Sequence, residues 1–231
     1  MKLLIFDVDG TLVQSVERAD SKCFAATYEA IYGKPFPTID WHQFPHVTDT
    51  TILQTVIRDH FGRALSESEK HAFEQKYMEL LRYNRRKQPH HFSEVAGARA
   101  MIHRVLSMPD TLVAIATGGW RKTAHIKMQH VGIPSQAFWV SGADGKTTRE
   151  AIIEESLEIA HRIEQRFSKI VYIGDAPWDV KTTRNMQLDF VGIRRRGDRE
   201  VLAELGATHV LQDYLDQEAF LEALQAAEPP K

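Results

Sequence analysis

The chain has 231 residues, of which 43% are hydrophobic, enough for one substantial core and a smaller second unit. Its 29 basic and 31 acidic residues give a net charge of −2, so we expect no broad basic surface for a nucleic-acid polymer. Cys23 is the single cysteine, which excludes an internal disulfide and fits a reducing compartment. No signal peptide is recognised before the first apolar segment, and no apolar run is long enough to span a bilayer. These features predict a cytoplasmic protein without a membrane partner.

The first predicted strand ends in two carboxylates. Residues 3–6 form an apolar run dense enough for a strand that is covered on both faces, and Asp7 and Asp9 follow one residue apart. Gly10 then allows the backbone to turn sharply. Two anions this close repel each other unless a cation lies between them, so the pair suggests a divalent metal ion. An Asp-Gly turn, with the other aspartate as a cap, is the alternative interpretation of this segment.

A second apolar strand, residues 112–116, leads into Thr117, Gly118 and Gly119. A hydroxyl and free backbone N–H groups at the end of a strand, just before a helix, can bind an anion. An ordinary strand-to-helix turn would have the same appearance, so this segment gains weight only together with the others.

A third apolar strand, residues 170–173, is followed by Gly174, Asp175 and, four residues later, Asp179. Pro177 suits the first turn of a helix. Asp179 would therefore lie one helical turn beyond Asp175 and face the same pocket. A capping Asp175 with a solvated Asp179 is the alternative.

Taken in chain order, these segments resemble the motifs of the haloacid dehalogenase-like (HAD) hydrolases over residues 3–179. The resemblance implies a nucleophilic aspartate that becomes an aspartyl-phosphate, and a second one that serves as general acid and then as general base. It also implies a phosphatase that uses Mg²⁺ and a small phosphate ester. The residues it assigns are Asp7 as nucleophile, Asp9 as acid and base, Thr117, Gly118 and Gly119 around the phosphate, and Asp7, Asp9 (through its backbone carbonyl), Asp175 and Asp179 around the metal ion.

The third motif of this family is a single basic residue, and the sequence predicts Lys146 for it. Lys146 follows a short strand and a turn, and it precedes a helical run from about residue 148 to 165. Many relatives have prolines after this lysine, whereas here Thr147, Thr148 and Arg149 follow. Lys122 and Arg149 therefore remain as lesser candidates.

Strand and helix signals alternate across the chain, which predicts a doubly wound parallel α/β sheet of the HAD-like, Rossmannoid type. In such sheets the ligand site lies at the carboxyl ends of the strands, where the motifs fall. Residues 1–13 and 93–231 are expected to form this catalytic core. Residues 14–92 have a helical pattern throughout and resemble the small helical cap of the phosphoglycolate phosphatase and β-phosphoglucomutase branch.

A loop of this predicted cap, residues 44–50, is where relatives place residues that meet the leaving group. His46, Thr48 and Asp49 are the predicted substrate-binding residues, although Asp49 could simply cap the next helix and His46 could be a surface residue. Trp120 and Trp178 each follow a motif, and core packing is favoured over a place in the pocket wall for both.

The predicted function is a Mg²⁺-dependent phosphatase that hydrolyses a small phosphate monoester. A phosphomutase of the same fold remains an alternative, as does a non-catalytic HAD-like binding or regulatory protein. The basic cluster at residues 194–196 is interpreted as a solvated loop rather than a steering site for an anionic substrate.

Overall fold

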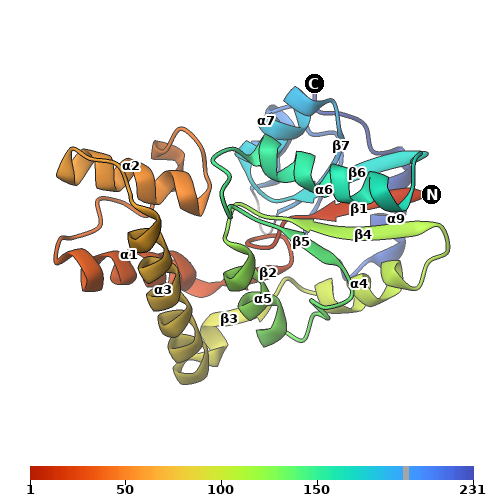
Figure 1. The fold of residues 1–231 in the computed structure, drawn as a ribbon. Coiled ribbons are helices and arrows are strands. Elements are labelled where there is room, and N and C mark those ends of the chain that lie inside the picture. Colours follow the sequence, from red (N-terminus) through yellow and green to blue (C-terminus); the bar gives the residue numbers. More distant parts are fainter. Residues whose placement is uncertain (195–197) are drawn as a thin grey trace.

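A parallel sheet forms the centre of the protein in a computed structural model, which describes residues 1–194 and 198–231 (Figure 1). Its six strands lie in the order β5-β4-β1-β6-β7-β8, and each pairs in parallel with its neighbours. The predicted doubly wound α/β fold is thereby confirmed. The strands are β1 (Lys2–Phe6), β4 (Thr111–Ala116), β5 (Trp139–Ser141), β6 (Lys169–Gly174), β7 (Asp189–Ile193) and β8 (Val210–Leu211).

Both faces of the sheet are buried. Successive side chains of a strand point to opposite faces, so Leu3 and Ile5 of β1 belong to one apolar cluster while Leu4 and Phe6 belong to another. Residues of α6 and α7 join the first cluster, and residues of α4 and α9 join the second. The helices of the core are α4 (Ala98–Leu106), α5 (Arg121–His130), α6 (Arg149–Ile163), α7 (Pro177–Met186), α8 (Arg199–Glu204) and α9 (Gln217–Ala226).

Three helices that follow β1 in the sequence and precede α4 lie beside the sheet in space (Figure 1). They are α1 (Ala19–Tyr32), α2 (Asp49–Phe61) and α3 (Glu67–Lys87), with 3₁₀ turns at Val16–Arg18, Trp41–Gln43 and Pro89–His91. The chain leaves and re-enters the core through an antiparallel pair, β2 (Val13–Ser15) and β3 (Phe92–Glu94). We keep the name cap for residues 14–92.

The start of α2 differs from the alternative interpretation in which Asp49 caps this helix. The N-cap is Thr48, whose hydroxyl accepts a hydrogen bond from the backbone N–H of Thr51 at 3.2 Å, and Asp49 is the first helical residue. The side chain of Asp49 is therefore available for contacts outside its own helix.

Trp120 of the core packs into the aromatic interior of the cap. Its ring centroid lies 6.0 Å from that of Phe24, 5.9 Å from Phe73 and 6.3 Å from Tyr77, and its side chain is fully buried. Its indole N–H donates to the hydroxyl of Thr50 at 3.0 Å. The prediction that Trp120 is a packing residue is confirmed, and the cap and the core share one apolar interior at this point.

No helix within residues 1–194 and 198–231 is both long enough and apolar enough to cross a membrane. In the predicted basic loop, Arg194 is a described residue and donates to the backbone carbonyl of Asp175 at 2.8 Å. Arg195 and Arg196 lie outside the described residues.

Candidate active site

Three adjacent strands bring predicted site residues together. β1 lies between β4 and β6, so Asp7, Thr117 and Asp175, which follow these strands, come to the same edge of the sheet. The backbone N–H of Asp7 still donates to the carbonyl of Ile173 at 2.9 Å, which continues the pairing of β1 with β6. The side chains of Asp7 and Thr117 are buried.

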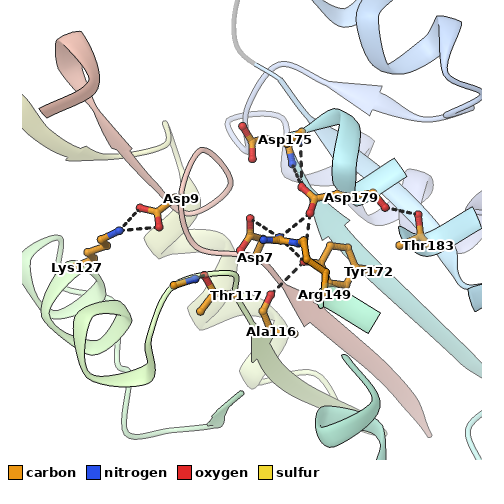
Figure 2. A network of polar contacts seen from close by, with 12 residues as sticks. Asp7, Asp9, Ala116, Thr117, Lys127, Arg149, Tyr172, Asp175, Asp179 and Thr183 are labelled. Carbon is orange, nitrogen blue, oxygen red and sulfur yellow. Dashed lines mark hydrogen bonds and ion pairs between the residues drawn. The ribbon is translucent and has the colours of Figure 1, made fainter. Parts of the chain in front are cut away.

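Asp7, Asp175 and Asp179 form an acidic cluster in which one carboxylate oxygen of each lies within 4.8 Å of the others. Asp179 is fixed within it, because its Oδ2 accepts hydrogen bonds from the backbone N–H groups of Asp175 at 3.1 Å and Ala176 at 3.0 Å (Figure 2). These donors lie at the start of α7, where a helix stabilises negative charge.

Burial and mutual repulsion make the ionised carboxylates of this cluster unfavourable. The pKa of Asp7 is raised from 3.8 to about 7, chiefly by burial and also by the carboxylates of Asp179 and Asp9, while Arg149 opposes the rise. Burial, together with the carboxylates of Asp179 and Asp7, raises the pKa of Asp175 well above its ordinary value. Oδ1 of Asp7 is buried without a hydrogen-bond partner among the described residues. An oxygen-only donor set of this kind fits a hard divalent cation such as Mg²⁺.

Arg149 is a cation that faces Asp7, the predicted nucleophile. Its Nη2 lies 3.1 Å from Oδ2 of Asp7 and 2.6 Å from Oδ1 of Asp179, and it also donates to the hydroxyl of Tyr172 at 3.1 Å (Figure 2). The Tyr172 hydroxyl in turn donates to the carbonyl of Ala116 at 3.1 Å. Arg149 is thus held by two carboxylates and a hydroxyl in a buried position.

The side chain of Lys146 pairs with Glu155 and not with Asp7, where the third motif was predicted. Its ammonium group lies 2.7 Å from Oε1 of Glu155 on α6, and these two side chains are 18% and 28% exposed. Lys122 is exposed on α5. The structure therefore brings Arg149, the lesser candidate for the third motif, to Asp7 in place of Lys146. Thr148 caps α6 and makes Arg149 its first residue, so the side chain starts at the edge of the sheet.

Asp9 lies outside the acidic cluster and points toward α5 (Figure 2). Lys127 donates to its Oδ1 at 2.8 Å and to its Oδ2 at 2.7 Å. Burial alone would lower the pKa of Lys127, but the carboxylate of Asp9 and other neighbours raise it well above its ordinary value. The predicted metal contact of Asp9 is through its backbone carbonyl and stays a prediction.

The loop after β4 lies close to the backbone of the cap at Val47 and to the side chain of Arg149. The hydroxyl of Thr117 accepts from the N–H of Gly119 at 3.2 Å, which orders the turn. A side chain at Gly118 would overlap Arg149 and would come within 2.5 Å of the carbonyl of Val47. Glycine is therefore required where this loop meets both the cap and the buried arginine.

A partly open cavity of about 130 Å³ lies between the sheet edge and the cap. Asp49 contributes to its wall and accepts a hydrogen bond from the N–H of Trp120 at 3.1 Å. His46 instead lines an outer cavity of about 600 Å³, and Trp178 lines both cavities rather than only packing in the core. Thr48 is a buried cap residue. The residues around the inner cavity are Asp7, Asp9, Ser15, Asp20, Ser21, Phe24, Trp41, Val47, Asp49, Ile52, Tyr77, Thr117, Gly118, Gly119, Lys127, Arg149 and Trp178.

Two site cations could have been recognised in the sequence by their unusual positions. Arg149 stands in the first turn of a helix, where a positive charge opposes the helix dipole unless carboxylates compensate it. Lys127 stands on the apolar face of α5 beside Ala124 and Met128, although lysine is rarely buried without a partner.

Comparison with known proteins agrees with this geometry. Residues 4–193 match the family model described as haloacid dehalogenase-like hydrolase. The glycerol-1-phosphate phosphohydrolase 2 of Saccharomyces cerevisiae is 24% identical over 127 residues, which are 52% of this chain and 51% of that protein. The chain thus aligns with about half the length of this curated relative.

Solved structures share the whole fold. The crystal structure of a hydrolase from Pseudomonas syringae matches with a TM-score of 0.69 at 19% identity and covers 97% of this chain and 99% of its own. An archaeal β-phosphoglucomutase from Pyrococcus sp. strain ST 04 matches with a TM-score of 0.56 at 17% identity, covering 98% and 99%. Because the family model reaches from β1 to β7 and includes the cap and the motif residues, the chain belongs to the haloacid dehalogenase-like hydrolases, as its sequence motifs predict.

Proposed function

We propose that this protein is a Mg²⁺-dependent phosphatase that hydrolyses a small phosphate monoester through an aspartyl-phosphate on Asp7. One observation carries the proposal: Asp7 is buried at the end of β1 as a member of the acidic cluster, it lines the cavity, and its Oδ1 has no hydrogen-bond partner among the described residues. Burying a carboxylate with an unpaired oxygen destabilises the fold unless a cation compensates its charge. A site that binds a cation together with an anionic ligand would explain it.

The chain supplies the groups that would hold the phosphate. The hydroxyl of Thr117 and the turn through Gly118 and Gly119 lie at the end of β4, on the cavity wall. The guanidinium of Arg149 lies beside Asp7 and lines the same cavity, where it would neutralise charge on the phosphoryl oxygens. In this proposal Arg149 takes the role predicted for Lys146.

The acidic cluster of Asp7, Asp175 and Asp179, with the backbone carbonyl of Asp9, would hold Mg²⁺. The bound ion would supply a positive charge that draws the phosphoryl group toward Asp7. Since Asp179 is fixed by backbone N–H groups and by Arg149, it would orient the other two acids.

The reaction then uses the two acids of the first motif in turn. Asp7 attacks phosphorus in line while Asp9 gives a proton to the departing oxygen, so the P–O bond breaks and an alcohol leaves. Asp9, now ionised, takes a proton from a water molecule while the oxygen of that water attacks the phosphorus of the aspartyl-phosphate. Inorganic phosphate leaves, and Asp7 is restored.

Release of inorganic phosphate from a panel of small esters with Mg²⁺ tests the proposal. The panel should contain p-nitrophenyl phosphate, phosphoglycolate, sugar phosphates and glycerol 1-phosphate, which the yeast relative's name suggests. We expect turnover by the wild type and none above background by Asp7→Asn. A folded wild type that hydrolyses no ester would overturn the proposal, and transfer of the phosphoryl group only to a sugar hydroxyl would indicate a mutase.

A further inference from the structure

A line of four charged side chains crosses the joint between the core and the cap. Lys127 of α5 lies 2.7 Å from Oδ2 of Asp9 and 3.7 Å from Oδ2 of Asp20 on α1. Both oxygens of Asp20 are 3.2 Å from Nη2 of Arg85 on α3. The charges alternate, from the candidate general acid in the core to the interior of the cap.

Burial of these charged side chains costs desolvation free energy, which ion pairs and hydrogen bonds must offset. The side chains of Lys127, Asp20 and Arg85 are 5%, 10% and 2% exposed, whereas that of Asp9 is 44% exposed toward the cavity. Desolvating ions in this way seldom stabilises a fold relative to apolar residues of similar volume. The open end of the line is the carboxylate with a proposed chemical role.

We propose that Lys127 is a positioning residue that holds the carboxylate of Asp9 for proton transfer, and that Asp20 of the cap holds Lys127 in turn. This inference rests on the proposed function. A single ammonium bonds both oxygens of Asp9, which fixes the direction of the carboxylate as well as its place.

The position of the pair agrees with the chemistry. In an in-line displacement the leaving oxygen departs on the side opposite to Asp7, which is the side of the cap. Asp9 and Lys127 both line the cavity together with cap residues, whereas Arg149 faces Asp7 from the α6 side (Figure 2). The two cations of the site thus serve different carboxylates.

Loss of Lys127 should therefore slow the steps that use Asp9 and spare the attack by Asp7. With p-nitrophenyl phosphate, whose leaving group needs no proton, Lys127→Met should release about one p-nitrophenolate per enzyme in a rapid burst. Steady turnover should then be slower than that of the wild type by about 10–100-fold, since misplacement of a reacting group by about 1 Å costs on this order.

Two further variants separate positioning from a structural role. Arg85→Met breaks the same line at its cap end but leaves Lys127 on Asp9, so it should lower stability while turnover changes less than about threefold. In an Asp9→Asn background, where no carboxylate remains to be positioned, Lys127→Met should add less than about threefold to the loss.

The outcomes are distinct. A wild type that hydrolyses no ester would overturn the proposed function and this inference with it. An active wild type with Lys127→Met equally fast, or with losses that multiply in the double variant, would overturn the inference alone. A loss in Arg85→Met equal to that in Lys127→Met would likewise show that Lys127 acts only through the stability of the joint.

Discussion

Replacing Arg149 by methionine should affect both folding and catalysis, whereas the same change at Lys146 should affect neither strongly. Arg149 lies within 3.1 Å of Asp7 and 2.6 Å of Asp179, and all three side chains are almost fully buried. Lys146 has a single partner, Glu155, in a partly exposed pair. Methionine keeps an unbranched apolar chain in place of the aliphatic part of either side chain and removes the charged group with its hydrogen bonds.

The expected magnitudes follow from these environments. At an effective dielectric constant of about 20, each carboxylate attracts the guanidinium by roughly 5–6 kcal/mol, most of it offset by desolvation. Removal of one partner leaves the acids uncompensated, which costs about 3–5 kcal/mol of unfolding free energy. The Lys146–Glu155 pair should contribute about 0–1 kcal/mol.

For turnover, loss of a buried donor that faces the phosphoryl group should cost about 10²–10³-fold in kcat. Arg149→Lys should restore little, because an ammonium cannot donate to Asp7, Asp179 and Tyr172 with the geometry of a guanidinium. Urea unfolding and kcat with p-nitrophenyl phosphate, measured for the wild type and the three variants, test this reasoning. A large loss at Lys146 with near-normal turnover of Arg149→Met would refute it and restore the assignment predicted from the sequence.

Three other outcomes are expected. Excess EDTA should abolish turnover and added Mg²⁺ should restore it, because the acids of the cluster otherwise repel the substrate; full activity in EDTA would contradict the metal site. Burial raises the pKa of Asp49 from 3.8 to about 7, so the folded state keeps a proton that the unfolded chain releases, and stability falls as the pH rises through this window. Asp49→Asn should remove up to about 2–3 kcal/mol of that fall between pH 5 and pH 8, as urea unfolding at these two pH values would show; identical pH dependence would disprove the role of Asp49. Gly10→Ala should cost at least about 1–3 kcal/mol in the same assay, since φ is 82° and the new methyl group would overlap the carboxylate of Asp175; wild-type stability would contradict this.

The sequence predicts the sheet edge well because the topology leaves little choice. Apolar runs that end in Asp7, Thr117 and Asp175 form parallel strands, and the carboxyl ends of neighbouring parallel strands meet at one edge. Each residue also follows its strand directly, so an error of one residue in a strand boundary does not move it out of the site.

The cations were harder to predict because tertiary contacts position them. The choice between Lys146 and Arg149 depends on how the loop before α6 is held, and the cap holds it: the hydroxyls of Thr50 and Thr51 donate to the carbonyls of Ala143 and Thr147. Neither hydrogen bond is local in sequence.

Lys127 illustrates the same limit over a longer separation. It meets Asp9 across 118 positions of the chain, and the periodicity of α5 indicates only that the residue is buried. The pattern therefore reveals that Lys127 needs a buried partner but not which carboxylate supplies it.

These contacts also make the cap and the catalytic loops one cooperative unit. The backbone N–H of Asp49 donates to the carbonyl of Gly118 at 2.8 Å, and Trp120, two residues further on, packs among the aromatic rings of the cap. The turn that would bind phosphate is therefore shaped from both sides, by β4 and by the start of α2. Substitution of Phe73, a cap residue that packs against Trp120, should then change turnover through this turn, and its effect should not be additive with those of Gly118 variants.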